Sequence, residues 1–316
     1  MLEATDLQVE FSGRGGRRAR AVDGVNLTIG AGEIVALVGE SGCGKTTLAR
    51  TLLGLERPAA GRITYDGQPL SYSGRALRAF RRQVQLVLQD PMGSLNPRHT
   101  VYEAVAEGPG IHRMPDEEAV VASALTRAGL RPPERFFHRY PHELSGGQRQ
   151  RVVIAGALAL DPKVLIADEP VASLDASVRG EILALLLRLR DELGLSALVV
   201  THDLGLAWNV ADRVAVMYLG RIVESGPTED VLTDPQHPYT QALLSVLPES
   251  PTRIVLTGEP PDPTRIPTGC RFHPRCQLVA AGNGTEACRT TPLPVLPATA
   301  HHPHAACHLL SAPIPT

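Results

Sequence analysis

The stretch EIVALVGESGCGKTTLARTL, residues 33–52, decides the fold. It begins with a short apolar run typical of a buried strand and ends in a helical pattern. Between the two, residues 39–46 match G-x-x-x-x-G-K-T, in which glycines let backbone N–H groups surround the β- and γ-phosphates of a nucleotide. Strand, glycine loop and helix in this order predict a phosphate-binding loop, assisted by the N-terminus of the following helix.

Two side chains of this loop have distinct chemistry. Lys45 supplies a positive charge to the phosphates, and the hydroxyl of Thr46 is a ligand for Mg²⁺. The alternative is a glycine-rich turn that matches by chance, and the flanking strand and helix argue against it. The residues expected to bind ATP here are Gly39, Ser41, Gly42, Cys43, Gly44, Lys45, Thr46 and Thr47.

A second apolar run, VLIADE at residues 164–169, ends in two carboxylates. Asp168 lies where a strand would end and can hold Mg²⁺ through water, and Glu169 can polarise the attacking water. An apolar run followed by Asp-Glu is common, so this pattern is weak by itself. At this distance after a phosphate-binding loop it indicates the other half of an ATPase site.

Strand and helix patterns alternate along most of the chain, which predicts an α/β fold with a mainly parallel sheet. Proline becomes dense after His237 and the periodicity fades. A Gly/Arg-rich hairpin at 12–20 contains Arg14, Arg17, Arg18 and Arg20, which could contact an anion but are expected to form a solvated loop tip. We predict a nucleotide-binding domain over 1–235, with a helical subdomain at about 95–160, and a small C-terminal extension over 236–316.

Composition narrows the function classes. The 316 residues include 31 basic and 33 acidic side chains, so the chain lacks the excess of basic residues that is typical of nucleic-acid binding. No run of about twenty apolar residues could span a bilayer, and the N-terminus lacks the pattern of a signal peptide. We therefore expect a cytosolic protein, for which any attachment to a membrane would come through a partner.

The segment LSGGQ at residues 144–148 lies between the two ATPase motifs. It resembles the signature of the ABC ATPases, and other marks of that family follow in order over residues 1 to about 235. Gln89 resembles the Q-loop glutamine, 173–175 the D-loop, and His202 the H-loop histidine. The resemblance implies an ABC ATPase core with a helical subdomain.

The resemblance also implies a role for each of these residues. Glu169 would be the catalytic base and His202 would bridge the γ-phosphate and the region of that base, while Gln89 would sense Mg²⁺ and the nucleophilic water. Phe11 matches the aromatic residue that stacks on adenine, although a buried strand residue is an equal alternative. The signature segment would cap the nucleotide of the opposite subunit through Ser145, Gly146, Gly147 and Gln148, beside the D-loop residues Ser173 and Asp175.

Two departures from the family pattern are mild. Cys43 stands where Ser or Gly is common, and its thiol is expected to be open to alkylation beside the phosphates. The D-loop has SLD in place of the commoner ALD.

Three segments are similar to the oligopeptide/dipeptide importer branch of the family: QDPMGSLNPR at 89–98, HPYTQALLSVLP at 237–248 and GCRFHPRC at 269–276. The segment EPVASLDASVRGEIL at 169–183 resembles the second ATPase of such systems more than the first. This resemblance implies a second ABC ATPase as heterodimer partner, two transmembrane permeases and an extracytoplasmic binding protein. Nickel importers share much of these segments, so a nickel importer remains an alternative. A soluble ABC ATPase acting in translation or DNA repair is a further alternative, but the chain has neither a tandem repeat nor a coiled-coil insert.

Four cysteines gather in the C-terminal fifth with the spacing C-x5-C-x11-C-x18-C: Cys270, Cys276, Cys288 and Cys307. Four thiolates can hold Zn²⁺ or a [4Fe–4S] cluster. Zinc sites usually contain C-x2-C pairs, which are absent, so the spacing favours a structural iron–sulfur cluster. Four reduced, buried cysteines and a redox-sensing regulatory site are the alternatives.

Overall fold

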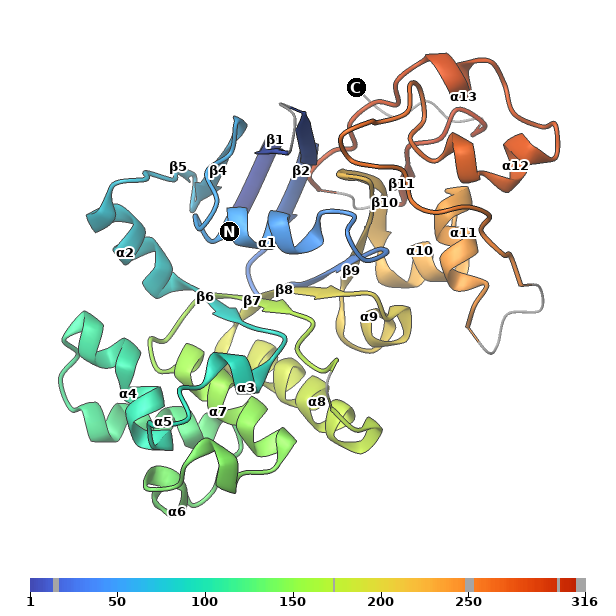
Figure 1. Cartoon of the computed structure of the whole chain (residues 1–316). Coiled ribbons are helices and arrows are strands. Elements are labelled where there is room, and N and C mark those ends of the chain that lie inside the picture. Colours follow the sequence, from blue (N-terminus) through green and yellow to red (C-terminus); the bar gives the residue numbers. More distant parts are fainter. Residues whose placement is uncertain (14–16, 173, 248–252, 300–301, 311–316) are drawn as a thin grey trace. The chain divides into compact units, whose positions relative to one another are not determined.

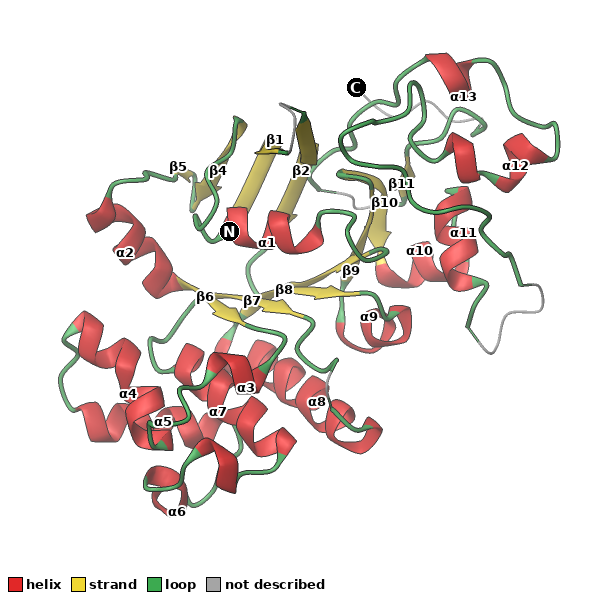
Figure 2. Ribbon diagram, in the orientation of Figure 1, coloured by secondary structure: helices red, strands yellow, loops and turns green. Residues whose placement is uncertain are grey.

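A computed structural model describes the chain except for residues 14–16, 173, 248–252, 300–301 and 311–316. It consists of two compact units. Figure 1 labels their helices and strands along the chain. One unit contains Met1–Ile29, Val35–Leu70 and Thr201–Thr316, and the other contains Gly30–Ile34 and Ser71–Val200. The expected α/β class is confirmed, with strands and helices in both units (Figure 2). The domain boundary near residue 235 stays a prediction.

The first unit contains two sets of paired strands. One is antiparallel, in the order β2-β1-β4-β5. The other has the order β11-β10-β9-β3, in which β3 and β9 are parallel and the remaining pairs antiparallel. The strands are β1 (Leu2–Ser12), β2 (Arg18–Ile29), β3 (Ile34–Val38), β4 (Ala60–Tyr65), β5 (Gln68–Pro69), β9 (Arg213–Tyr218), β10 (Arg221–Pro227) and β11 (His304–Ala305).

The helices of this unit are α1 (Lys45–Leu52), α9 (Leu204–Val210), α10 (Thr228–Thr233), α11 (Pro238–Leu244), the 3-10 turn η3 (His273–Arg275), α12 (Gln277–Ala280) and α13 (Ala287–Thr290). One apolar core contains side chains from β3, β9 and α11 and from the cysteine-containing segment. Three aromatic rings, those of Tyr218, Tyr239 and Phe272, are fully buried in it. The segment after residue 236 therefore packs into the same core as the strand that precedes the phosphate-binding loop.

The second unit contains parallel strands in the order β8-β7-β6. They are β6 (Val84–Val87), β7 (Val164–Asp168) and β8 (Ser196–Thr201). Their buried, Val- and Leu-rich sequences suit strands that are covered on both faces. The helices are α2 (Gly74–Gln83), α3 (Pro91–Ser94), α4 (Val101–His112), α5 (Glu117–Arg127), α6 (Glu134–Phe137), the 3-10 turn η2 (Pro141–Glu143), α7 (Gly146–Leu158) and α8 (Ala176–Leu193).

The helical pattern over 101–160 corresponds to α4 through α7. Thr100 and Glu103 form a capping box that starts α4, with the Thr100 Oγ1 accepting from the Glu103 N–H at 3.3 Å. Pro141 stands at the first position of η2, where its missing N–H is not needed. These local signals explain why the sequence places the helices of this region well.

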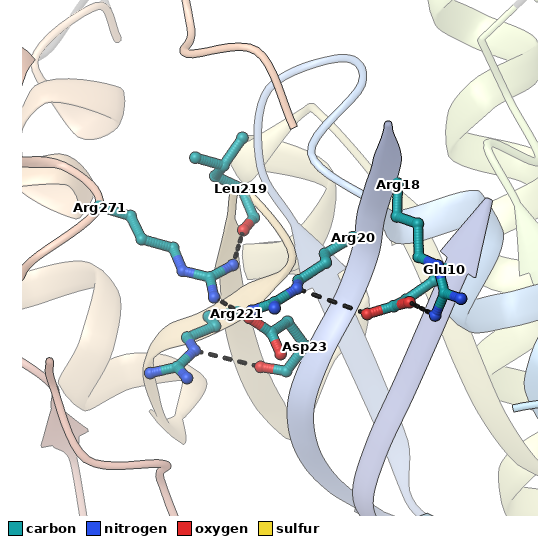
Figure 3. Close-up of polar contacts among 7 residues, drawn as sticks. All are labelled: Glu10, Arg18, Arg20, Asp23, Leu219, Arg221 and Arg271. Carbon is teal, nitrogen blue, oxygen red and sulfur yellow. Dashed lines mark hydrogen bonds and ion pairs between the residues drawn. The ribbon is translucent and has the colours of Figure 1, made fainter. Parts of the chain in front are cut away.

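The arginines of the N-terminal hairpin correct one expectation (Figure 3). Strand β2 begins at Arg18, so Arg18 and Arg20 lie on a strand and not in a loop, but their side chains are exposed, as expected. Both form ion pairs with Glu10, at 3.2 Å from Arg18 Nη1 and 3.4 Å from Arg20 Nε. Their spacing along β2 places both on one face, which the count of charges in the sequence does not reveal.

Candidate nucleotide-binding and catalytic site

The backbone of the phosphate-binding loop has a shape that only glycine allows. Gly39 and Gly44 have φ angles of 154° and 112°. A Cβ at Gly39 would lie 2.2 Å from the carbonyl oxygen of Met217, and one at Gly44 would lie 2.1 Å from that of Ala21. The loop thus lies directly on β2 and β9, and the glycines are required by this close approach.

Lys45 is the buried charge of the loop, with 6% of its surface exposed. Its Nζ donates to the carbonyl oxygens of Gly39 at 2.6 Å and Glu40 at 2.9 Å. These contacts hold the ammonium group inside the loop at the start of α1. Ser41 and Thr46 are exposed beside it, so the side chains proposed for phosphate and Mg²⁺ are open to solvent.

Cys43 is buried, and burial raises the pKa of its thiol, although the nearby Lys45 opposes this change. A neutral thiol is a poor nucleophile. Burial of the thiol therefore argues against the expectation that Cys43 is open to alkylation.

Two more predicted residues lie in the same unit. Phe11 is on β1 with 41% of its surface exposed, so the alternative of a buried strand residue is wrong. His202 follows β8 directly and is exposed. Asp203 caps the next helix, α9, with its Oδ1 accepting from the Leu206 N–H at 3.1 Å, which fixes the backbone after His202.

The second unit contains the predicted carboxylates. Asp168 is buried at the end of β7, and Glu169 follows with a φ of 46°. This left-handed conformation costs free energy in a residue other than glycine and is typical of functional sites. Gln89, after β6, donates from Nε2 to Glu169 Oε2 at 3.4 Å. The structure brings together the residues proposed as base and water sensor.

The signature segment forms the N-terminus of α7, a helix of 13 residues. Ser145 is the exposed N-cap, and its Oγ accepts from the Gln148 N–H at 3.2 Å. A reciprocal hydrogen bond joins the same two residues, in which the Gln148 Oε1 accepts from the Ser145 N–H at 3.1 Å. Gly147 is required because a Cβ there would lie 2.6 Å from Val178 Cγ1. The segment presents a hydroxyl and helix N–H groups that favour an anion.

The D-loop is only partly described. Asp175 is exposed at the start of α8, and its side chain makes no capping bond to that helix. Ser173 lies outside the described residues.

The four C-terminal cysteines line one small cavity, together with the imidazole of His237. Within the described residues, no group of three or more His, Cys, Asp or Glu side chains is arranged to hold a metal ion. Burial raises the pKa of Cys270 to about 11, and it also raises that of Cys307. The four thiols therefore line the same cavity, but they are not arranged around one metal position.

Sequence reasoning did not single out Tyr239 and Arg275, which both contact Glu40 of the phosphate-binding loop. Both lie in segments that resemble the peptide-importer branch, 237–248 and 269–276. An arginine between two cysteines was a visible signal, but nothing local indicated that it reaches a residue 235 positions earlier.

Fold and motifs define an ATPase of the ABC class. Residues 22–172 match the family model described as ABC transporter, and residues 223–282 match that of the oligopeptide/dipeptide transporter C-terminal region. The chain belongs to the ABC transporter ATP-binding subunits that have this C-terminal region. As a member, it is an ATP hydrolase that uses ATP with Mg²⁺.

Two relatives show the extent of the similarity. The dipeptide transport ATP-binding protein DppF of Haemophilus influenzae is 45% identical over 86% of this chain and 84% of its own length. The oligopeptide transport ATP-binding protein AppF of Bacillus subtilis is 41% identical over 98% of both chains.

Solved structures support the same class. The cbiO1 protein of Clostridium perfringens, part of the ABC transporter complex cbiONQ, is 35% identical with a TM-score of 0.67, over 74% of this chain and 90% of its own. A dimeric ATP-binding cassette bound to ADP and Pi is 30% identical with a TM-score of 0.63, over 72% of this chain and 99% of its own. Within the described residues, no helix is long and apolar enough to cross a membrane.

Proposed function

We propose that this chain is the ATPase that powers uptake of dipeptides or oligopeptides through partner permeases. The observation that carries the proposal is the match of residues 223–282 to the oligopeptide/dipeptide transporter C-terminal region, behind a complete set of ABC motifs. Relatives named for dipeptide and oligopeptide transport align over most of the chain. The nickel importer remains the alternative substrate class.

ATP would bind with its phosphates against the loop 39–47 and its adenine on Phe11. Lys45 compensates phosphate charge, and its present bonds to two loop carbonyls keep it oriented until the phosphates replace them. Mg²⁺ is a hard cation that prefers oxygen ligands, and it would neutralise charge on the β- and γ-phosphates. The hydroxyl of Thr46, the amide oxygen of Gln89 and the carboxylate of Asp168 are donors of that kind.

Glu169 would accept a proton from the attacking water as that water adds to the γ-phosphate. Gln89 already contacts this carboxylate, so it can orient the water and sense whether the nucleotide is present. His202 would bridge the γ-phosphate and the region of Glu169. These residues position groups around one phosphate, which is the main contribution of a protein to phosphoryl transfer.

A head-to-tail dimer would complete the site. The signature segment exposes Ser145 and the N-terminus of α7, and the anion it suits is the γ-phosphate held by a second ATPase subunit. This arrangement makes a lone subunit a poor ATPase, because the donors for its γ-phosphate come from the partner. The partner would be a second ABC ATPase in a heterodimer.

A groove in the second unit is suited to the permeases. It has a volume of about 370 Å³ and is lined by β6, α3, α4 and α7. Leu88 and Ile111, on its wall, are 45% and 52% exposed, so the groove presents apolar surface to a binding partner. Leu88 directly precedes Gln89. A short permease segment in this groove would connect Gln89, the proposed nucleotide sensor, to the cytoplasmic face of the membrane. On the other side of the membrane, an extracytoplasmic binding protein would deliver the peptide.

The four cysteines would hold a [4Fe–4S] cluster with a structural role. Their thiols line one cavity, and four thiolates are the donor set of such a cluster. A cluster distributes its ligands over four irons, so they need not converge on one ion as Zn²⁺ requires. Iron and sulfide contents near four per chain after anaerobic purification, with visible absorption, would support the cluster. One equivalent of zinc, or no metal, would contradict it.

The test of the transport assignment is a pull-down of the tagged chain from detergent-solubilised membranes, with co-purifying proteins identified by mass. Two multi-spanning permeases and a second ABC ATPase are expected. Recovery of ribosomes, nucleic acid or no membrane protein would overturn the importer assignment, while the ATPase chemistry would stand.

A further inference from the structure

Glu40, the second residue of the phosphate-binding loop, is held at three points. Its carboxylate accepts two bonds from the guanidinium of Arg275, at 2.7 Å and 3.0 Å. Its N–H donates to the Tyr239 hydroxyl at 2.8 Å, and its carbonyl accepts from Lys45 Nζ at 2.9 Å. Two of the three contacts come from the C-terminal part of the chain, more than 190 residues away in sequence.

Arg275 is held firmly in this position. Its side chain is 6% exposed, and it lies in the turn η3, between Cys270 and Cys276. Its Nη1 lies 3.5 Å from the Tyr218 hydroxyl, and its guanidinium lies 6.0 Å from the centre of the Tyr218 ring. A planar, bidentate arginine–carboxylate pair in such a site has a defined orientation that a lysine could not reproduce.

Arg271, which lies just before η3, anchors the same segment at a second place. Arg271 donates to the side chain of Asp23 on β2 and, at 2.5 Å, to the Leu219 carbonyl (Figure 3). The next residue, Gly220, donates its N–H to the Cys43 carbonyl of the phosphate-binding loop at 2.8 Å. We call residues 269–276 the arginine turn. It contacts the phosphate-binding loop directly through Arg275, and through Arg271 it contacts Asp23 and Leu219, next to the loop.

We propose that Arg275 is a positioning residue for ATP binding, acting through Glu40, so that the arginine turn is part of the nucleotide site. This inference rests on the proposed ATPase function and deepens it. Glu40 places a negative charge in a loop that must bind a polyanion. Arg275 offsets that charge and fixes the backbone of Glu40, whose carbonyl orients Lys45.

The test is a double-mutant cycle on the full-length chain. Arg275→Ala, Glu40→Gln and the double variant are compared with Arg265→Ala, which removes an exposed arginine of the same C-terminal part. ATP affinity is measured by displacement of a fluorescent ATP analogue in EDTA, where no turnover occurs, and thermal unfolding is recorded in parallel. KM and kcat for ATP are then measured separately, with the partner ATPase subunit present.

Arg275→Ala should weaken ATP binding roughly tenfold and raise KM more than it lowers kcat, because the negative charge of Glu40 in the phosphate-binding loop is then no longer offset. Adding Glu40→Gln should restore most of the affinity, and Arg275→Lys should restore only part of it. Affinity equal to that of Arg265→Ala would overturn the proposal. So would equal weakening in the single and double variants, since Arg275 would then act on stability and not through Glu40.

The proposed function fails separately from this inference. Absence of ATP hydrolysis by the wild-type chain with its partner subunit would contradict the ATPase assignment. Normal hydrolysis by the wild type together with unchanged affinity in Arg275→Ala would leave that assignment intact and remove only the positioning role.

Discussion

Gln89 Nε2 donates to the carboxylate of Glu169 across 3.4 Å, although the two residues are 80 positions apart in sequence. Glu169 accepts this bond while its backbone is in the left-handed conformation, with a φ of 46°. The contact joins the residue proposed as the base to the residue proposed to sense nucleotide. It gives a physical route by which occupancy of the site can alter the segment 89–98 that follows.

Glu169→Gln should abolish ATP turnover, by at least about a hundredfold, and should trap an ATP-bound dimer, because the amide cannot accept the water proton. Hydrolysis is measured as phosphate release, and the dimer by size-exclusion chromatography with ATP. Glu192→Gln removes an exposed carboxylate elsewhere and should behave as the wild type. Near wild-type hydrolysis by Glu169→Gln would remove Glu169 from its proposed role.

Ser145 should both cap helix α7 and donate its hydroxyl to the γ-phosphate bound by the partner subunit. Two substitutions separate these roles. Ser145→Ala loses the N-cap of α7, which costs about 1 kcal/mol, and the hydroxyl for the γ-phosphate. Ser145→Asp keeps a capping oxygen but places a negative charge against that phosphate. We expect stability by urea unfolding to be nearly retained in Ser145→Asp while hydrolysis is lost. Full activity in that variant would show that the signature segment does not face a phosphate.

Cys43 should resist alkylation in the native protein. Burial raises the pKa of its thiol above the ordinary value, so the reactive thiolate is scarce near neutral pH and increases only at higher pH. Iodoacetamide labelling followed by peptide mass spectrometry measures this, with the urea-unfolded chain as the control for reactivity. Labelling at pH 7.5 as fast in the native as in the unfolded chain would contradict the buried position.

His237 should make the first unit less stable in acid. Burial lowers its pKa to about 3, while in the unfolded chain the pKa returns to its ordinary value near 6.5. Between these values the unfolded state binds a proton that the native state excludes, so stability falls as pH decreases from about 6.5 toward 3, by at most ~1.4 kcal/mol per pH unit.

The matched variant is His237→Asn, which keeps an acceptor for the Tyr239 N–H, bonded to Nδ1 at 3.0 Å, but does not titrate. From pH 7 to pH 5 the wild type should lose roughly 2 kcal/mol more unfolding free energy than the variant, measured by urea unfolding. Equal losses would mean that His237 is not held neutral.

The motifs were predictable because each is local. The strand and helix around the phosphate-binding loop, the capping box at Ser145 and the strand before Asp168 all follow from neighbouring residues. The family resemblance assigned Gln89 to Mg²⁺ and the nucleophilic water and Glu169 to the base, but it did not predict the hydrogen bond between them. Burial of Cys43 was not predictable, since it depends on how β2 and β9 approach the loop.

The contacts of the C-terminal part were the least predictable. Proline density and fading periodicity indicated a separate extension after His237. In the structure, Tyr239 and Phe272 are buried in the same core as β3 and β9, and Arg275 reaches Glu40. Sequence patterns describe local structure, and long-range pairing of buried arginines with acidic residues leaves no periodic signal.

The most direct test of the central claim is uptake of a labelled dipeptide by cells that lack this chain, complemented with the wild type or with Glu169→Gln at equal expression. We predict that the wild type restores ATP-dependent uptake and that Glu169→Gln does not. Restoration of nickel uptake without peptide uptake, or peptide uptake that survives Glu169→Gln, would contradict the account.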